Sequence, residues 1–400
     1  MKDLQQAADN YLCPTYARYP LAVKSALGCT LYDLDGKEYL DLLSGISVCN
    51  LGHSHPEVVS AIASQAGKLI HVSNLFYQEE QVALAKKLIN TCSMNKVFFC
   101  NSGAEANEGA IKLTRRYMRK VLQQDRFEII TLSGSFHGRT LATLTATGQD
   151  KIKDGFDPLP PGFKIVPHND AHALEQAVNE HTAAIMLEII QGEGGIRIID
   201  ARYMEKVVQL CARHDLLLIV DEIQTGMGRT GMFWAHQHYQ LNPDIITSAK
   251  ALANGLPMGA VLCTDKTARA FDQGSHGTTF GGSPLACAAA LKVLEIMERE
   301  GTVYRADRLG REFMAIMEGI MLNHPEKIKE VRGKGLMLGI ELSFPGKNIW
   351  QALLNKGFVL NLTQETVLRL LPPLIISMED INRFCVCLDS LLNDSTLCRN

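Results

Sequence analysis

Leu216-Leu217-Leu218-Ile219-Val220-Asp221-Glu222 is an apolar run of strand length that ends in two carboxylates. A second short run begins at Pro243 and ends in Ser248-Ala249-Lys250, where small residues precede a lysine. In a parallel α/β sheet, ligands bind beyond the carboxyl ends of the strands. We therefore expect Asp221 and Lys250 to lie at one crevice.

This pair of residues points to a particular chemistry. A carboxylate can pair with a pyridinium nitrogen, and a nearby lysine can form a Schiff base with an aldehyde. Together they are the protein half of pyridoxal-phosphate chemistry. The pair alone shows only that such a site is possible.

The surrounding sequence predicts an α/β fold with a mainly parallel central sheet. Apolar runs of strand length alternate with helical patterns such as residues 202–214, and this alternation is typical of crossover helices. Asp35-Gly36 predicts a β-hairpin in a β-rich N-terminal segment, and Pro56 opens a helix. The expected strands are residues 97–100, 127–132, 163–166, 183–190, 216–220 and 245–247.

The domain prediction divides the chain into three parts. Residues 51–283 form a large domain that holds the strands described above. Residues 284–400, which begin with a helix from Leu285 to about Glu300, form a smaller α+β domain. Residues 1–50 join this smaller domain.

Composition excludes several classes of protein. The net charge is −3 and no basic tract is present, so no nucleic-acid partner is expected. No apolar run is long enough to span a bilayer, so no membrane is expected. Eleven scattered cysteines without a C-x-x-C pair favour a reducing, cytoplasmic location. Twelve histidines lack a metal-binding spacing, so no metal is predicted.

Two turns carry candidate ligand-binding groups. Residues 101–107 (NSGAEAN) follow a strand and open a helix, which makes an anion site where Gly103 permits close backbone approach. In residues 135–140 (SFHGRT), Phe136 can stack on a planar ring and Arg139 can bind a carboxylate through two N–H groups. Taken alone, each turn is more simply a capped helix start or an ordinary loop.

Three further segments hold polar groups in unusual places. Glu188 lies inside an apolar run and needs a partner if buried, and Glu193 lies in a glycine-rich turn. Residues 274–282 (GSHGTTFGG) form a glycine-rich loop that can hold a phosphate or serve as a connector. Arg369 lies between apolar neighbours in residues 368–373 (LRLLPP). A charge on the wet face of an edge strand is the simpler alternative for it.

In combination and in this order, these motifs resemble the class III pyridoxal-phosphate aminotransferases from about Pro14 to Leu392. The resemblance implies fold type I, pyridoxal 5'-phosphate as cofactor, and a homodimer with shared active sites. It is carried by residues 51–56 (LGHSHP), 101–108, 136–140, 191–195, 221–231, 247–250, 275–282 and 332–335.

The resemblance also implies roles for individual residues. Lys250 bonds to the cofactor and moves the proton, and Asp221 keeps the ring nitrogen protonated. The remaining cofactor contacts implied are Gln224 with the phenolic oxygen, Phe136 with the ring face, Gly103 and Ala104 with the phosphate, and Thr279 with the phosphate of the neighbouring subunit.

For the substrates, the resemblance implies that Arg139, with Thr278, binds the α-carboxylate of the amino donor. Glu193 pairs with Arg369 in that half-reaction and swings away when 2-oxoglutarate arrives, so that Arg369 can bind the acceptor. Ala104, Ile189 and Ser283 depart from the commonest family pattern without removing a required chemical group.

The implied reaction moves the terminal amino group of N2-acetylornithine to 2-oxoglutarate, giving N-acetylglutamate 5-semialdehyde and glutamate in arginine biosynthesis. Succinylornithine, ornithine and other ω-amino acids remain alternative donors. An aminomutase or racemase on the same fold is a second enzyme class, and Arg369 argues against it. A binding protein without activity is a third class, against which Lys250 and Asp221 both argue.

Overall fold

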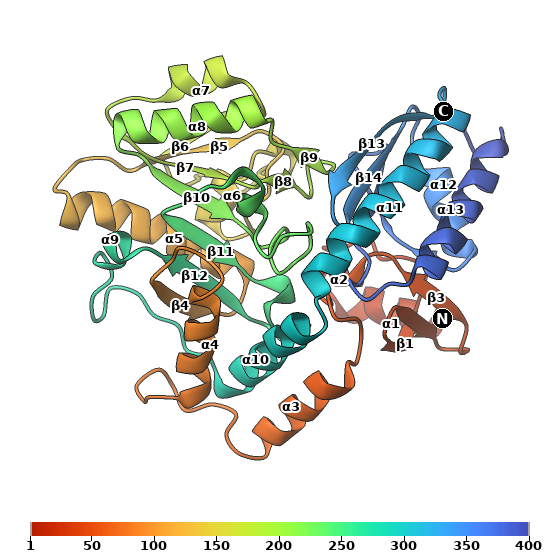
Figure 1. Ribbon diagram of the computed structural model, residues 1–400, viewed down its shortest axis with the longest axis horizontal. Coiled ribbons are helices and arrows are strands. Elements are labelled where there is room, and N and C mark those ends of the chain that lie inside the picture. Colours follow the sequence, from red (N-terminus) through yellow and green to blue (C-terminus); the bar gives the residue numbers. More distant parts are fainter. Residues whose placement is uncertain (1, 399–400) are drawn as a thin grey trace.

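The computed structural model describes residues 2–398, and a seven-stranded sheet lies at its centre (Figure 1). Its strands are, in spatial order, β4 (Lys96–Cys100), β12 (Gly259–Cys263), β11 (Ile245–Ser248), β10 (Leu217–Asp221), β7 (Thr182–Leu187), β5 (Glu128–Leu132) and β6 (Phe163–Val166). Strand β12 is antiparallel to β4 and β11, and the other neighbours are parallel. The predicted mainly parallel sheet is confirmed, although β12 was not among the expected strands.

Both faces of this sheet are covered by helices. Leu217 and Ile219 belong to the buried cluster that includes α5 (Gly103–Arg116). Leu218 and Val220 belong to the cluster on α8 (Ala201–His214). Successive strand residues point to opposite faces, so a continuous apolar run such as β10 is explained by burial on both sides. Figure 1 shows α7 (Ala171–Ala177) and α8 along one side of the sheet.

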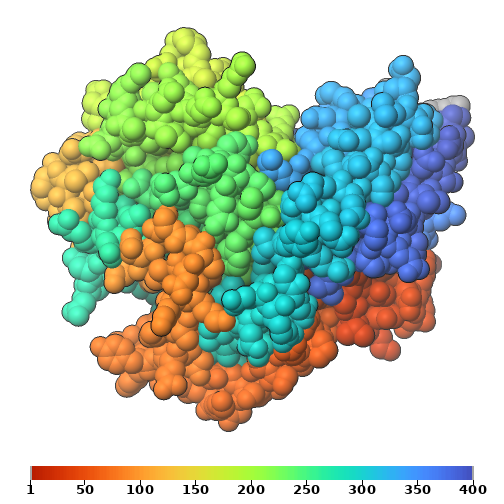
Figure 2. Space-filling model, viewed as in Figure 1, coloured from red at the N-terminus to blue at the C-terminus, as the bar shows by residue number. Residues whose placement is uncertain are grey.

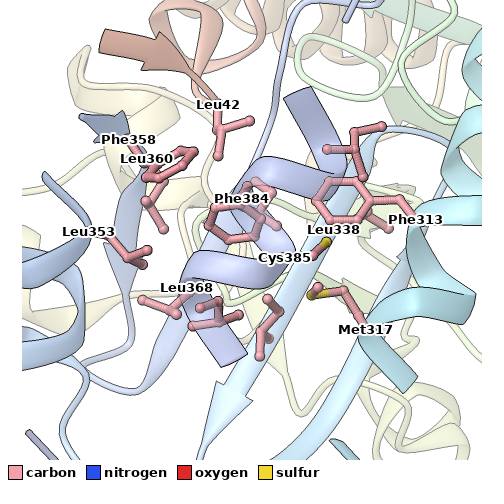
Figure 3. Close-up of a cluster of buried hydrophobic side chains, with 14 of the residues drawn as sticks. Leu42, Phe313, Met317, Leu338, Leu353, Phe358, Leu360, Leu368, Phe384 and Cys385 are labelled. Atoms are coloured by element: carbon pink, nitrogen blue, oxygen red, sulfur yellow. The ribbon is translucent and has the colours of Figure 1, made fainter. Parts of the chain in front are cut away.

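The C-terminal part of the chain forms a second layered body. It contains the sheet β13 (Ile328–Lys334), β14 (Met337–Leu342), β17 (Val367–Leu370) and β16 (Asn361–Thr363), with helices α11 (Thr302–Asn323), α12 (Lys347–Asn355) and α13 (Met378–Asn393). In its core, the ring of Phe384 packs edge-on against Phe313 and Phe358 (Figure 3).

The N-terminal segment joins this C-terminal body. Strands β1 (Val23–Leu27), β2 (Thr30–Asp33) and β3 (Glu38–Asp41) form a sheet with β15 (Phe358–Val359). Leu42 lies in the same apolar cluster as Phe384 (Figure 3), and Figure 2 shows the red N-terminal segment lying against the blue C-terminal part of the chain. The predicted hairpin at Asp35-Gly36 is confirmed as β2–β3.

Local elements agree with several other expectations. Helix α3 (Pro56–Ala66) begins at the predicted proline. Helix α10 (Pro284–Arg299) begins behind Ser283, whose side chain caps it, and packs against α3 and α4 (Glu79–Ile89). The exact domain boundaries stay a prediction. Shorter elements are α2 (Ser44–Ser47), α6 (Leu141–Ala146), α9 (Asp265–Ala268) and the ribbon of β8 (Ile190–Gln191) with β9 (Arg197–Ile198).

Two expectations were wrong in detail. The N-terminal segment, predicted as β-rich, begins with helix α1 (Lys2–Tyr11). The apolar run 183–190 is not one strand, because β7 ends at Leu187 and β8 starts at Ile190 in a different sheet. Within residues 2–398, no helix combines the length and the apolar character required to cross a bilayer.

Candidate active site

The carboxylate of Asp221, at the end of β10, is buried in a network of hydrogen bonds. Its Oδ2 accepts from Asn107 Nδ2 (2.7 Å) and is paired with His137 Nδ1 (2.8 Å), and its Oδ1 accepts from Ile223 N (3.0 Å). Burial acts to lower the pKa of His137, but the bond to Asp221 outweighs it and the pKa is raised. These three hydrogen bonds hold the Asp221 carboxylate in one orientation.

Lys250 faces the same cavity as Asp221. The parallel pairing of β10 with β11 aligns Asp221 with Thr247, and the lysine follows three residues later with a left-handed φ of 44°. The cavity has a volume of about 380 Å³. Burial lowers the pKa of the Lys250 ammonium, and the carboxylates of Glu193 and Asp221 act in the opposite direction. A lysine with a lowered pKa is suited to bond formation and proton transfer.

The N-terminus of α5 closes one side of this cavity. Ser102 caps the helix by accepting from Glu105 N, and Gly103 and Ala104 line the cavity. The first N–H groups of a helix have no partner within the helix, so they attract an anion. A Cβ atom at Gly103 would lie 2.9 Å from the Ile223 side chain, so a larger residue there would require Ile223 to shift.

The loop before α6 supplies an aromatic ring and a cation. Phe136 N donates to Glu188 Oε1 (2.8 Å), which fixes the start of the loop. The Arg139 guanidinium lies 5.5 Å from the centre of the Phe136 ring. Arg139 is exposed and forms no ion pair within residues 2–398, so its N–H groups are open to a ligand.

A second arginine at this site is buried and already paired. Arg369 Nη1 donates to Glu193 Oε1 at 2.5 Å, and Gln224 Oε1 lies 3.5 Å from the same nitrogen. Burial acts to raise the pKa of Glu193, but Arg369 outweighs it and the pKa is lowered. Gln224 lines the cavity, so the Glu193–Arg369 pair lies at its margin.

The two threonines predicted from the glycine-rich loop lie away from the cavity wall of this chain. Thr278 Oγ1 accepts from Asn101 Nδ2 (3.1 Å), and Asn101 lines the cavity. Thr279 is exposed. The structure therefore gathers Lys250, Asp221, Gly103, Ala104, Phe136, Arg139 and Gln224 around one cavity.

Sequence reasoning missed three polar residues of this site. Asn107 and His137 both bind Asp221 but were assigned no role, since their partner lies on a distant strand. Glu188 was noted only as a carboxylate in an apolar run, and its partners are the backbone N–H groups of Phe136 and Gly192. Burial raises the pKa of Glu188 to about 7. The available signal was position: Asn107 and His137 lie inside the two quoted turns, and Glu188 interrupts an apolar run.

The cavity fits pyridoxal phosphate as a cofactor. Asp221 supplies a carboxylate for the pyridine nitrogen, Phe136 an aromatic face, and the start of α5 free N–H groups for the phosphate. Lys250 supplies the amine.

The sequence matches a known enzyme family over nearly its whole length. The profile of the family described as "Aminotransferase class-III" matches residues 11–392. Acetylornithine aminotransferase of Methanocaldococcus jannaschii is 50% identical over 384 residues, which cover 96% of each chain. Acetylornithine aminotransferase of Caldanaerobacter subterraneus is 46% identical and covers 96% of this chain and 98% of that relative.

Solved structures show the same fold. Ornithine aminotransferase from Toxoplasma gondii aligns with a TM-score of 0.95 at 31% identity, covering 100% of this chain and 96% of that one. Acetylornithine aminotransferase from Elizabethkingia anophelis aligns with a TM-score of 0.87 at 32% identity, covering 98% of this chain and 99% of that one. These likenesses confirm the predicted aminotransferase fold.

Proposed function

This chain belongs to the class III pyridoxal-phosphate-dependent aminotransferases, and we propose that it moves the terminal amino group of N2-acetylornithine to 2-oxoglutarate. The products are N-acetylglutamate 5-semialdehyde and glutamate. Relatives named acetylornithine aminotransferase, at 44–50% identity, support this donor. The same reaction would place the protein in arginine biosynthesis.

The chain's own residues divide the chemistry between them. Pyridoxal phosphate, when bound, supplies an electron sink and the carbon that carries the amino group between substrates. Lys250 would hold the cofactor and carry the proton to and from the reacting carbon. Asp221, oriented by Asn107 and His137, would keep the ring nitrogen protonated. Gln224 would contact the phenolic oxygen, Phe136 would cover the ring, and Gly103 and Ala104 would bind the phosphate.

The observation that carries the proposal is that the site has two arginines in different states. Arg139 is open and exposed, whereas Arg369 is buried and neutralised by Glu193. With Glu193 in place, only Arg139, helped by Thr278, binds a carboxylate, which selects a donor with one α-carboxylate and a terminal amine. When Glu193 leaves, Arg369 binds the α-carboxylate of 2-oxoglutarate, so one site serves two substrates in turn.

The switch is tested by measuring the two half-reactions of Arg369→Ala separately. We expect the second-order rate constant of the half-reaction with 2-oxoglutarate to fall about a hundredfold or more, because a buried charge contact is lost. The reaction with N2-acetylornithine should change far less. Equal losses in both half-reactions would refute the switch.

The donor is tested by a panel of amines compared as kcat/KM, since discrimination resides in that ratio. N2-acetylornithine should exceed succinylornithine, ornithine and 4-aminobutyrate. A higher kcat/KM for ornithine would assign the chain to the ornithine branch, which is also represented among its structural relatives.

We also propose a homodimer in which Thr279 of one subunit binds the cofactor phosphate of the other. Thr279 is exposed and outside the cavity wall of its own chain, and the next residue, Phe280, is an exposed apolar side chain. A cytoplasmic location is supported by the eleven cysteines, all of which are free thiols.

A further inference from the structure

The buried guanidinium of Arg369 has a second partner that the reaction scheme leaves without a role. Its Nη2 donates to Asn361 Oδ1 at 2.8 Å. The two residues face each other in the ladder between β16 and β17. Arg369 is only 1% exposed, so almost all of its hydrogen bonding must come from protein groups or from substrate.

The amide of Asn361 can adopt only one orientation. A guanidinium has donors and no acceptor, so the amide oxygen must face Arg369. The amide nitrogen then donates to the Tyr19 hydroxyl at 3.1 Å. The Tyr19 ring packs edge-on against Trp350, with ring centres 4.8 Å apart, and Trp350 Nε1 donates to Leu360 O. The N-terminal segment thus fixes the acceptor of Arg369.

The main chain at Glu193 is held by the hairpin that β16 and β17 form. Thr363 Oγ1 and Gln364 Nε2 both donate to the carbonyl oxygen of Glu193, at 3.0 and 2.8 Å. Arg332 Nε donates to Gly195 O at 2.9 Å. With its backbone bound, Glu193 can release Arg369 only by rotating its side chain. The contacts that then remain on the guanidinium are Asn361 Oδ1 at 2.8 Å and, at the longer distance of 3.5 Å, Gln224 Oε1.

A neutral acceptor suits this place better than a charged one. A carboxylate at residue 361 would form a lasting ion pair with Arg369 and compete with the incoming substrate, because two opposite charges shielded from water attract each other strongly. An amide oxygen orients the guanidinium but leaves its charge uncompensated.

We propose that Asn361, held by Tyr19, is a positioning residue that keeps Arg369 oriented for the carboxylate of the 2-oxo acid after Glu193 has moved away. This inference rests on the proposed function, since it assumes that Arg369 binds the amino acceptor.

The test uses the holoenzyme with Asn361→Asp, Asn361→Leu and Tyr19→Phe, and Asn355→Asp as the control. Asn355 is exposed on α12 and receives the same new charge away from the site. Single-turnover rates are measured for N2-acetylornithine and for 2-oxoglutarate. Calorimetry gives the Kd of glutarate, a dicarboxylate that lacks the reacting carbonyl.

We expect Asn361→Asp to lose about tenfold or more in the 2-oxoglutarate half-reaction and in glutarate affinity, with less than about a twofold change for the donor. Asn361→Leu and Tyr19→Phe should shift the same half-reaction by smaller factors. Tyr19→Phe keeps the ring packing, so it tests the inference even if the Asn361 variants fold poorly. The control should match the parent protein.

The Arg369→Lys variant distinguishes a failure of this inference from a failure of the proposed function. If Arg369→Lys impairs 2-oxoglutarate selectively but the Asn361 and Tyr19 variants do not, only the inference is overturned. If Arg369→Lys leaves 2-oxoglutarate turnover intact, the proposed acceptor contact and the inference are both wrong. Equal losses in both half-reactions for the Asn361 variants would show a merely structural role.

Discussion

At the scale of single residues, buried charges organise the backbone that leads to the active site. Asp41 ends β3, and its Oδ1 accepts from Leu43 N (2.8 Å) and Ser44 N (2.9 Å). Its Oδ2 pairs with His53 Nε2 at 2.7 Å. One carboxylate therefore ties the chain after β3 to the histidine of the LGHSHP motif, and it does so in a mostly buried setting.

This pair predicts a pH dependence of stability. The hydrogen bond to Asp41 raises the pKa of His53 from 6.5 to about 10 in the folded state. The stability gained is therefore complete below about pH 6.5 and is lost as the pH rises to about 10. Urea titrations across this pH range should show that the difference in unfolding free energy between the parent protein and His53→Gln becomes smaller as the pH rises. An advantage that is constant with pH would contradict the assignment.

At the scale of elements, close backbone contacts decide where a helix can pack. Helix α11 contains two glycines in different surroundings. A Cβ atom at Gly310 would lie 2.1 Å from the carbonyl oxygen of Gly335, in the turn between β13 and β14. A Cβ atom at Gly319 would meet nothing within 4 Å. The first glycine is required by packing, whereas the second only weakens the helix.

We predict opposite effects of the same substitution on this helix. Gly310→Ala should destabilise the protein by about 1–3 kcal/mol, because the helix must move away from the turn. Gly319→Ala should stabilise it by roughly 0.5–1 kcal/mol, since alanine has the higher helix propensity. The free energy of unfolding from urea titration measures both. Stabilisation by Gly310→Ala would refute the packing argument.

At the scale of the whole molecule, Arg229 joins three distant parts of the chain. Its guanidinium is fully buried and donates to Ser44 Oγ, Ser47 Oγ and Asn50 Oδ1 of the N-terminal segment. It also donates to the carbonyl oxygens of Leu336 and Pro372. Through Pro372, which follows β17, it links the loop after Asp221 to the strand that carries Arg369.

Arg229→Lys should therefore destabilise the protein strongly. A lysine ammonium cannot reach all the acceptors that the planar guanidinium binds through its three nitrogens. Each buried acceptor left without a hydrogen bond costs about 1–3 kcal/mol. Arg126→Lys is the matched control, because Arg126 also donates to main-chain carbonyls but is partly exposed. It should change the free energy of unfolding by about 0.5 kcal/mol or less. Similar losses for both would argue against a special role of Arg229.

The proposed dimer is a second prediction at this scale. Tyr77 and Phe280 are exposed by 105% and 63%, and Asn74 Nδ2 donates to Gly281 O, so their segments lie together. The parent protein should have twice the 44.1 kDa mass of the chain. Tyr77→Glu with Phe280→Glu should give a monomer that retains cofactor poorly. The control Val386→Glu alters an exposed apolar residue of α13 and should stay dimeric.

That dimer is checked by light scattering over a range of concentrations, with the cofactor followed by its visible absorption. A parent protein that is monomeric at all concentrations, or a double variant that is dimeric, would count against the shared site. Normal cofactor retention in a monomeric variant would remove the role of Thr279.

The sequence by itself determined the α/β class, most strands of the central sheet and the Asp221–Lys250 pair. These depend on short patterns: an apolar run ends where a polar residue appears, and the carboxyl ends of parallel strands share one edge. The helix start at Pro56 was readable for the same reason, and the helix predicted from Leu285 begins one residue earlier, at Pro284, since capping is decided within a few residues.

The tertiary structure decided which distant residues meet. The contact of Glu193 with Arg369, 176 positions apart, was expected only from the family resemblance, and that of Arg229 with Asn50, 179 apart, was not expected. No local pattern specifies such pairs, because they depend on the order of strands in two sheets and on the packing of the N-terminal segment against the C-terminal body. Strand β12 went unrecognised for the same reason: its place between β4 and β11 is set by partners far away in the chain.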